Sequence, residues 1–203
     1  MGCNLSCCWC DTPYTWDGAR FDLRMTTRWM TVADVMDQLT PTPIVVLTGG
    51  EPLLQQDRPE FHALLRALVD AGRSIHVETN GTQVPNGMLL AHAEAIIVSP
   101  KIANAGQHRG HQDPTPAVEL VNISHRPNMY LKVVCQDRWD VGVALALARQ
   151  LRWPKQRVWV MPQGTTSEQL AQRWPMIVNE AAKCGINATH RLHTLAWGDE
   201  RGH

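Results

Sequence analysis

The chain has 203 residues, of which 44% are hydrophobic and 19% are charged, and its 19 acidic side chains balance 19 basic ones. A single domain of this length buries roughly 70% of its unfolded surface, so it needs no disulfides to form a core. The sequence lacks the ~18-residue apolar run of a membrane span. Zero net charge argues against a protein whose main ligand is a phosphate backbone or an anionic lipid. We therefore expect one soluble domain with no nucleic-acid and no membrane partner.

The cysteines are unevenly distributed, because four of the six lie within the first ten residues: Cys3, Cys7, Cys8 and Cys10. A secreted disulfide scaffold is usually short, spreads its cysteines and follows a signal peptide, and this sequence shows none of these features. Cys135 and Cys184 occur in apolar stretches, which is typical of buried, unreactive thiols. The pattern favours a metal site in a reducing cytoplasm.

From residue 44 onward, short β-branched runs alternate with segments of helical periodicity, which predicts a parallel sheet covered by crossover helices. The expected strands are Ile44–Leu47, Ser74–Val77, Ala95–Val98, Met129–Val134, Arg157–Val160 and Thr189–Leu192. The expected helices are Val32–Leu39 after Thr31, Arg58–Asp70, Arg138–Leu151 and Ser167–Cys184, the last capped by Thr166 or Ser167 and ended by Gly185. The irregular stretch Ala103–Pro116 predicts a surface loop or lid.

In such folds the chemistry gathers at the carboxyl ends of the strands. The unusual residues of this sequence occur at those ends, in the segments 48–52, 78–81, 99–101 and 161–164. Glycine pairs, asparagine-glycine turns and strand-end lysines are also common for structural reasons alone. The position of the segments therefore predicts one shared site, and each segment by itself is also consistent with an ordinary turn.

The spacing Cys3-x3-Cys7-x2-Cys10, with Trp9 before the last cysteine, offers three thiolates from one loop. Three soft ligands suit an iron-sulfur cluster and leave one iron without a protein ligand. A structural zinc site requires a fourth ligand, and no second Cys/His pair with matching spacing follows. Zinc binding and chance clustering of thiols remain alternatives to the cluster.

The cysteine loop resembles the signature of the radical S-adenosylmethionine (SAM) superfamily. Four further motifs narrow the resemblance to the 7-carboxy-7-deazaguanine synthase family, and they extend over nearly the whole chain. The motifs are GCNLSCCWCDT at 2–12, LTGGEPLLQ at 47–55, VETNGT at 77–82, SPK at 99–101 and RLHTLAWGDERG at 191–202. The resemblance implies a partial (β/α) barrel of the small radical SAM type, with a mostly parallel sheet and outer helices.

The resemblance also implies a set of cofactor contacts. Cys3, Cys7 and Cys10 would hold a 4Fe-4S cluster, with Cys8 as a bystander, and no catalytic side chain is expected beyond the cluster and SAM. Gly49 and Gly50 would let backbone groups approach the SAM ammonium, with Glu51 as a counter-charge. The remaining expected cofactor contacts are Trp9, Asp11, Glu78, Asn80, Ser99, Pro100, Lys101, Met161, Pro162 and Gln163.

A magnesium ion is expected with the Thr12 hydroxyl as its protein ligand and with substrate oxygens and water at the other positions. Without the resemblance, Thr12 would be interpreted as a turn-capping residue. Thr48, Trp197 and His203 are the expected substrate contacts. The implied reaction begins with reductive cleavage of SAM, proceeds through hydrogen abstraction from 6-carboxy-5,6,7,8-tetrahydropterin and ring contraction, and releases ammonia and 7-carboxy-7-deazaguanine.

The sequence departs from the family at its start, where Cys3 is the third residue. Family members carry a leading segment that supplies the first strand and several substrate contacts. We therefore expect residues 1–203 to form a single radical SAM domain without its first strand, from an amino-terminally truncated sequence. A complete chain that lacks these contacts is the other interpretation, and it would weaken pterin binding.

Two other functions remain open from the sequence. A small radical SAM activase acting on a glycine of a partner protein would not need the Asp11-Thr12 pair or the carboxyl-terminal motif. A non-enzymatic iron-sulfur protein would not cleave SAM. For the favoured enzyme, the resemblance implies a small-molecule pterin substrate, a flavodoxin- or ferredoxin-type electron donor, a homodimer and a cytoplasmic location.

Overall fold

The computed structural model describes residues 2–110 and 112–198. The strands are β1 (Ile44–Leu47), β2 (Ser74–Thr79), β3 (Ala93–Val98), β4 (Met129–Cys135), β5 (Val158–Pro162) and β6 (Asn187–Ala188). The α-helices are α1 (Leu23–Thr26), α2 (Val32–Gln38), α3 (Pro59–Asp70), α4 (Gly87–His92), α5 (Arg138–Gln150), α6 (Ser167–Cys184) and α7 (Leu192–Trp197). Short 3-10 helices include η1 (Pro13–Thr15), η2 (Pro52–Gln55), η3 (Ala103–Ala105), η4 (Val118–Asn122) and η5 (Lys155–Arg157).

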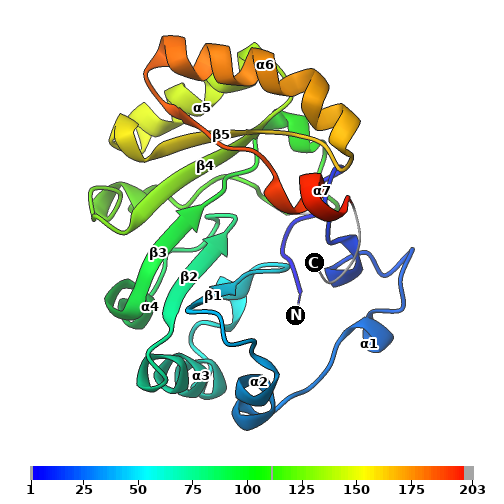
Figure 1. The fold of residues 1–203 in the computed structure, drawn as a ribbon, viewed down its shortest axis with the longest axis vertical. Helices are drawn as coiled ribbons and strands as arrows, with labels where there is room; N and C mark the ends of the chain where they lie inside the picture. Colours follow the sequence, from blue (N-terminus) through cyan, green and yellow to red (C-terminus); the bar gives the residue numbers. More distant parts are fainter. Residues whose placement is uncertain (1, 111, 199–203) are drawn as a thin grey trace.

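The strands form one six-stranded sheet in the order β1-β2-β3-β4-β5-β6, and every neighbouring pair is parallel. The sheet curves around the amino-terminal segment, while α3, α4, α5 and α6 lie on the outer side of the curve (Figure 1). Among the described residues β1 and β6 pair only with β2 and β5, so the sheet is open. The expected α/β architecture of a partial barrel is confirmed.

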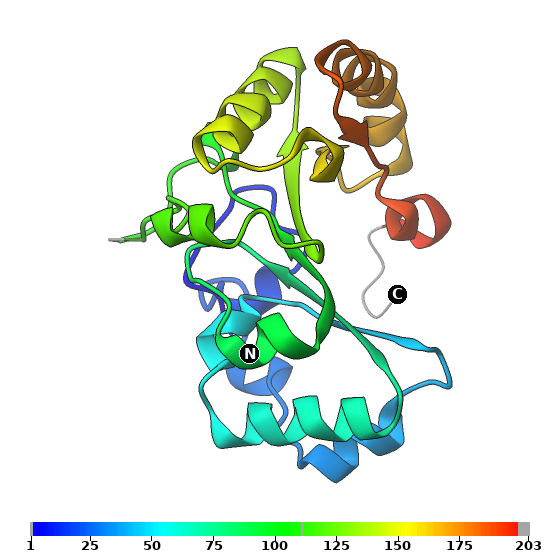
Figure 2. The ribbon, with the colours of Figure 1, turned by 90° about the vertical axis from the view of Figure 1, so that its left-hand side faces the viewer.

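The core lies between the sheet and these outer helices. Alternate residues of each strand point towards it, as Val77 of β2 and Leu131 of β4 do, and both are fully buried. Helices α5 and α6 contribute Val141 and Ile177 to the same core. Figure 2 shows the helices from their outer side, packed along the strands. Each buried aliphatic side chain stabilises the fold by roughly 1.5–3 kcal/mol, so this layer supplies most of the apolar stabilisation.

The helix ends follow the capping residues in the sequence. Thr31 and Asp34 form a reciprocal capping box at the start of α2. The Thr166 hydroxyl accepts a hydrogen bond from the Gln169 amide at the start of α6, and Gly185 ends that helix in the left-handed conformation. The predicted cap and stop of α6 are therefore confirmed, with Thr166 rather than Ser167 as the cap. No helix within the described residues is both long enough and apolar enough to cross a membrane.

The predicted strand at Thr189–Leu192 is wrong. The last strand is Asn187–Ala188, which pairs with Trp159 and Val160 of β5. The chain then turns away from the sheet, because the guanidinium of Arg191 bonds to Asp11 and to the carbonyl oxygen of Gly164. Helix α7 begins at the next residue. Helix α4 was not predicted, because its six residues are too few for a clear helical period.

Candidate active site

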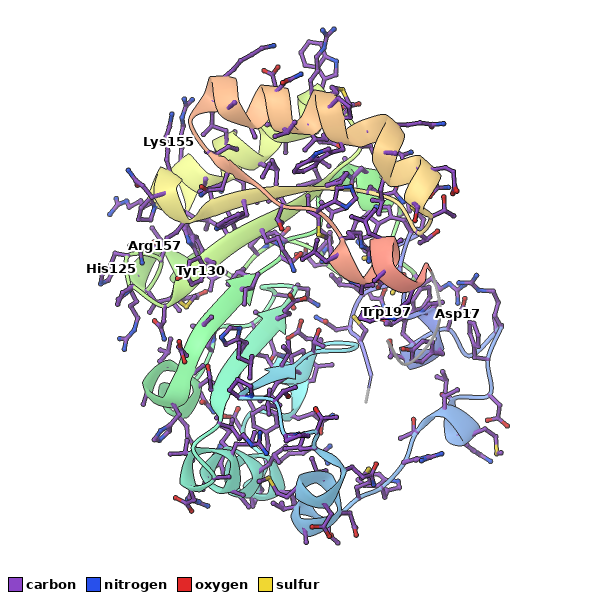
Figure 3. All side chains as sticks on the ribbon, in the orientation of Figure 1. Asp17, His125, Tyr130, Lys155, Arg157 and Trp197 are labelled. Carbon is purple, nitrogen blue, oxygen red and sulfur yellow. The ribbon has the colours of Figure 1, made fainter. Side chains whose placement is uncertain are left out.

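The inner face of the sheet is the face opposite the helices. Residues that alternate with the core positions point towards it, and at the carboxyl ends of the strands they are mostly polar. The inner-face residues at or near these ends are Thr48 after β1, Glu78 and Asn80 at β2, Ser99 after β3, Lys132 in β4, and Met161 and Gln163 at β5. Figure 3 shows the two ends of the sheet, with Tyr130 and Arg157 labelled at the amino end and Asp17 and Trp197 at the carboxyl end. Apart from Lys132, the residues in this list are predicted site residues, and they share the carboxyl ends of the strands.

The cysteine loop brings three of its four thiols together. Leu5, Cys7 and Ala105 form a small buried apolar cluster, against which Cys3, Trp9 and Cys10 pack. Cys8 is exposed, and its thiol lies 3.6 Å from the carbonyl oxygen of Asn104. The geometry thus separates Cys8 from the other three thiols, as the sequence predicts.

The three grouped thiols interact electrostatically. Burial raises the pKa of the Cys7 thiol to about 11, against an opposing contribution from the positive charge of Lys101. Burial also raises the pKa of Cys3, and the nearby Glu51 and Cys10 act in the same direction. Within residues 2–110 and 112–198, no three His, Cys, Asp or Glu side chains converge on a single metal ion. Three thiolates from one loop are a donor set that suits a 4Fe-4S cluster, with one iron left without a protein ligand.

The segment after β3 holds the cysteine loop in place. The Trp9 indole donates to the carbonyl oxygen of Asn104 at 2.8 Å, and the Cys8 amide donates to the carbonyl oxygen of Ala105 at 2.9 Å. The Asn104 side chain in turn donates to Asp140 of α5 at 2.7 Å. The stretch Ala103–Pro116 was expected to be a surface loop or lid, and most of its described residues are exposed and irregular. Its first residues also form the seat of the cysteine loop, a role that no local sequence signal indicates.

Further along the same stretch, Ser6 is held from two sides. Its amide donates to Nδ1 of His108 at 3.0 Å, and its hydroxyl oxygen accepts a hydrogen bond from the Arg109 amide at 2.7 Å. The Arg109 guanidinium donates to Asp17 at 3.0 Å, and Asp17 is fully buried. These contacts attach the stretch to Ser6, between Cys3 and Cys7, and to Asp17, beyond Cys10.

The two glycines after β1 have different surroundings. A Cβ atom at Gly50 would overlap the carbonyl oxygen of Gly2, and this oxygen accepts a hydrogen bond from the Glu51 amide at 2.8 Å. A Cβ at Gly49 would meet no atom within 4 Å. Both glycines have positive φ angles, of 83° and 62°. The close approach at Gly50 is therefore made by the protein's own backbone, and only Gly49 leaves space for a ligand.

Glu51 is buried and its carboxylate accepts three hydrogen bonds. Oε1 accepts from the Leu53 amide at 3.0 Å and from the Thr79 hydroxyl at 2.7 Å, and Oε2 accepts from the Asn80 amide at 2.6 Å. Burial raises the pKa of this carboxyl, although these donors oppose the shift. Oε2 retains one acceptor position, which is available to an ammonium group.

Asn80 connects the cysteine loop to β2. Its side-chain amide donates to Oδ1 of Asn4 at 2.8 Å. Its own Oδ1 accepts from both the backbone amide and the hydroxyl of Thr82. Asn4 also donates to the Thr82 hydroxyl. Gly81 follows with φ 79°, and a Cβ there would overlap Val98. The Asn80-Gly81 turn therefore has a structural role in fixing the loop.

Lys101 is directed inward rather than into solvent. Its ammonium donates to the carbonyl oxygen of Ser99 at 2.7 Å and to the Ser99 hydroxyl at 3.0 Å, and it lies 5.7 Å from the ring centre of Trp9. Burial lowers the pKa of this ammonium, whereas the nearby thiols and Glu51 raise it. A lysine has three donors, so one remains for a ligand. Pro100, between Ser99 and Lys101, is buried.

Asp11 and Thr12 follow the cysteine loop. The carboxylate of Asp11 pairs with the buried guanidinium of Arg191, which connects the amino-terminal loop to the residue before α7. Thr12 occupies the N-cap position of η1, but its side chain makes no capping hydrogen bond and instead lies 3.6 Å from the Cys10 sulfur. The turn-capping role that the sequence left open for this hydroxyl is therefore not observed.

Lys132 is a further candidate site residue, which was not predicted from the sequence. Its ammonium donates to Glu78 at 2.7 Å, and its side chain is only 17% exposed. The signal was present as a single charge inside the apolar strand sequence MYLKVVC. Arg191 belongs to a quoted motif, but its partner Asp11 is 180 positions away and cannot be inferred from sequence spacing.

The remaining predicted residues lie around this edge. Met161 and Gln163 point to the inner face, whereas Pro162 faces the helices, because only alternate residues of β5 share a face. Thr48 is exposed on the inner face, and Trp197 is about half exposed at the end of α7. His203 lies outside the described residues.

The chain is similar to known proteins over nearly its whole length. The model of the radical SAM superfamily matches residues 1–106. A 7-carboxy-7-deazaguanine synthase of Pyrobaculum aerophilum is 32% identical over 203 residues, which cover 99% of this chain and 85% of that protein. A 7-carboxy-7-deazaguanine synthase of Halobacterium salinarum is 30% identical, over 98% of this chain and 80% of its own.

Solved structures show the same fold. QueE from Escherichia coli superposes with a TM-score of 0.61 at 20% identity, covering 94% of this chain and 82% of its own. SuiB from Streptococcus suis, in a structure with bound S-adenosylmethionine, gives a TM-score of 0.60 at 14% identity over 96% of this chain and 47% of its own. At these identities the likeness concerns the fold.

Proposed function

Because this chain belongs to the radical SAM superfamily and, within it, to the 7-carboxy-7-deazaguanine synthase family, we propose that it converts 6-carboxy-5,6,7,8-tetrahydropterin into 7-carboxy-7-deazaguanine with loss of ammonia. One observation carries the proposal. Cys3, Cys7 and Cys10 share an apolar cluster beside the polar carboxyl edge of the sheet, while Cys8 lies apart.

The three grouped thiols would hold the 4Fe-4S cluster of the superfamily. They come from one short loop, they are partly or fully buried, and the nearby Lys101 ammonium favours the thiolate forms of Cys3 and Cys7. When bound, the cluster and SAM supply a reductive cleavage that starts hydrogen abstraction from the substrate. The protein's own contribution is to place these groups and to exclude water from them.

The amino-acid part of SAM has a complementary site at this edge. Glu51 offers its remaining acceptor position to the ammonium, beside the open space at Gly49. Lys101 and Ser99 offer donors to the carboxylate. The positions of the Glu51 carboxylate and the Lys101 ammonium would then fix the direction in which SAM lies.

The nucleoside part would lie over the inner face. Glu78 suits the ribose hydroxyls, because a carboxylate accepts hydrogen bonds from both. Met161 and Gln163 would contact the adenine ring, with Pro162 shaping the strand from its other face and Pro100 shaping the turn at β3. The remaining residues would contribute indirectly. Trp9 would hold the Lys101 ammonium against its ring, Asp11 would position Arg191, and Asn80 would position the cysteine loop.

The substrate and a magnesium ion would occupy the remaining space on the inner face. The Thr12 hydroxyl makes no capping hydrogen bond, which supports it as a Mg²⁺ ligand. Water and substrate oxygens would complete the coordination shell. Such an ion orients the substrate and stabilises negative charge on its oxygens. Thr48, Trp197 and His203 would contact the substrate.

The partners and the domain organisation belong to the same proposal. The enzyme would take its electron from a flavodoxin- or ferredoxin-type protein, act as a homodimer and function in the cytoplasm. Residues 1–203 would constitute a single radical SAM domain.

The test is anaerobic reconstitution with iron and sulfide, followed by incubation with SAM, dithionite and 6-carboxytetrahydropterin. Mass spectrometry should detect both 5'-deoxyadenosine and 7-carboxy-7-deazaguanine, and omission of Mg²⁺ should slow product formation. Deoxyadenosine without the deazaguanine would leave only the superfamily chemistry standing. Reconstituted protein that does not cleave SAM would contradict the whole proposal.

A further inference from the structure

The ion pair between Lys132 and Glu78 lies on the inner face, away from the helix-facing core. Leu131 and Val133 flank Lys132 and are fully buried towards the helices, so Lys132 points to the opposite side. The Lys132 side chain is 17% exposed and the Glu78 side chain is 39% exposed. A pair in this setting is screened by water less than a surface pair.

The two partners come from strands that are not neighbours. In the register, Glu78 of β2 lies beside Ile97 of β3, which lies beside Tyr130 of β4, and Lys132 is two residues further along. Two strand spacings separate the backbones by about 10 Å. The bond therefore requires a long side chain that crosses over β3, and the 2.7 Å distance from Nζ to Oε1 shows that Lys132 reaches across.

The pair leaves Glu78 with one oxygen committed and one available. Oε1 accepts from Lys132, and among the described residues Oε2 accepts no hydrogen bond. With the carboxylate held at one oxygen, its second oxygen points in a fixed direction over the inner face. Two adjacent hydroxyl groups are a ligand that a single oriented carboxylate can accept from, whereas another carboxylate would be repelled.

We propose that Lys132 is a positioning residue that orients the Glu78 carboxylate towards the ribose hydroxyls of SAM. This inference rests on the proposed function, because it takes SAM as the ligand of the inner face. Lys132 touches Glu78 rather than the reacting atoms.

The test uses binding without turnover. Equilibrium binding of SAM to the reconstituted, oxidised protein is measured for wild type, Lys132→Met, Lys132→Arg and Tyr130→Phe, since Tyr130 lies on the same face of the same strand. Lys132→Met should weaken SAM binding by about 10-fold or more, the effect of losing one charge-assisted hydrogen bond. Lys132→Arg should recover most of that loss, and Tyr130→Phe should bind like wild type.

A second ligand series assigns the loss to the ribose. Binding of 5'-deoxyadenosine, in the presence of methionine, should be weakened by Lys132→Met, whereas binding of 2',3',5'-trideoxyadenosine, which has neither ribose hydroxyl, should change little. Glu78→Gln should give the same pattern, and the double variant should lose no more than either single variant. An equal loss for both nucleosides would overturn the role at the ribose.

Two further results separate the possible failures. Wild-type protein that forms the cluster but does not bind SAM would contradict the proposed function itself. Wild-type protein that binds SAM, alongside a folded Lys132→Met variant of unchanged affinity, would overturn only the inference about Lys132. Cluster absorbance and the thermal unfolding midpoint of each variant establish that the compared proteins are folded.

Discussion

Different interactions stabilise two regions of the molecule: the core between the sheet and its helices, and the seat of the cysteine loop. The core consists of aliphatic side chains from successive strands and helices, such as Ile96, Leu131 and Ile177. Where the cysteine loop meets its seat, the buried apolar cluster of the described residues has three members, Leu5, Cys7 and Ala105. Hydrogen bonds from distant segments provide the rest of its stability.

Those hydrogen bonds connect positions far apart in the chain. Asn4 bonds to Asn80, Ser6 to Arg109 and Trp9 to Asn104, with sequence separations of 76, 103 and 95 residues. The position of the cysteine loop therefore depends on the segments that follow β2 and β3. The core cluster of the described residues, by contrast, contains no residue of the cysteine loop, so the loop relies on the sheet more than the sheet relies on the loop.

The largest expected effect comes from the cysteines themselves. Cys7→Ala removes a thiol from the buried group and should abolish cluster formation, because two remaining thiolates cannot hold three irons. Cys8→Ala removes an exposed thiol outside the group and serves as the matched control. Iron content and cluster absorbance after anaerobic reconstitution provide the measurement. Loss of the cluster in Cys8→Ala with retention in Cys7→Ala would show that the ligands are assigned wrongly.

The next largest effect concerns the core. Leu131→Ala creates a cavity at a fully buried site of β4 and should lower the free energy of unfolding by about 2–5 kcal/mol. Urea denaturation of the cluster-free protein measures it. The exposed substitution Leu192→Ala, in α7, is the control and should cost less than ~1 kcal/mol. Equal losses at the two sites would contradict the assignment of Leu131 to the core.

The same contrast explains what the sequence could predict. Strands such as Ile44–Leu47 and helices such as Ser167–Cys184 were predicted at the observed bounds, because local periodicity and capping residues determine them. The separation of Cys8 from its neighbours was also predicted, because the spacing of the three ligands belongs to a recognisable motif. Local patterns were sufficient in these cases.

Contacts between distant residues could not be predicted in this way. Arg191 leaves the sheet to pair with Asp11, so the expected strand at Thr189–Leu192 does not form. Asn104 lies in a stretch rich in Gly, Gln and His whose composition suggested only a surface loop. Gly50 was expected to admit SAM, but its missing side chain admits the Gly2 carbonyl. In each case a polar or backbone contact connects residues that are far apart in the chain.

A smaller effect is expected at the seat of the loop. Asn104→Ala removes the donor to Asp140 and to the Val134 carbonyl and should destabilise the fold by about 1–3 kcal/mol. It should also speed reaction of Cys7 with a thiol reagent in the cluster-free protein, because the loop loses its seat. Asn122→Ala, at an exposed asparagine, is the matched control. Unchanged labelling of Cys7 in Asn104→Ala would indicate that the loop is held by other contacts.

The smallest effect is a pH dependence at Asp17. This residue lies beyond the cysteines and binds Arg109 of the stretch Ala103–Pro116. Its buried carboxylate accepts hydrogen bonds from Arg20 at 2.5 Å and from Arg109 at 3.0 Å. The hydrogen bond from Arg20 lowers the pKa of Asp17, and the one from Arg109 adds to it. Because the folded-state pKa is lowered, this stabilisation is present above the ordinary Asp value of about 4 and is lost as the pH falls through the lower folded-state value.

Asp17→Asn should therefore be less stable than wild type at pH 7, and the gap should narrow as the pH falls below about 4. Both arginines are more than half exposed, so solvent screens the interaction and the gap should be small. Urea denaturation at a series of pH values measures it, with Asp70→Asn at the exposed end of α3 as the control. A gap that stays constant from pH 7 to the acid range would mean that the Asp17 hydrogen bonds, rather than its charge, hold the stretch. In that case the two arginines would hold this stretch through hydrogen bonds that do not need the Asp17 charge. Asn4 and Trp9 hold the cysteine loop through uncharged hydrogen bonds of the same kind.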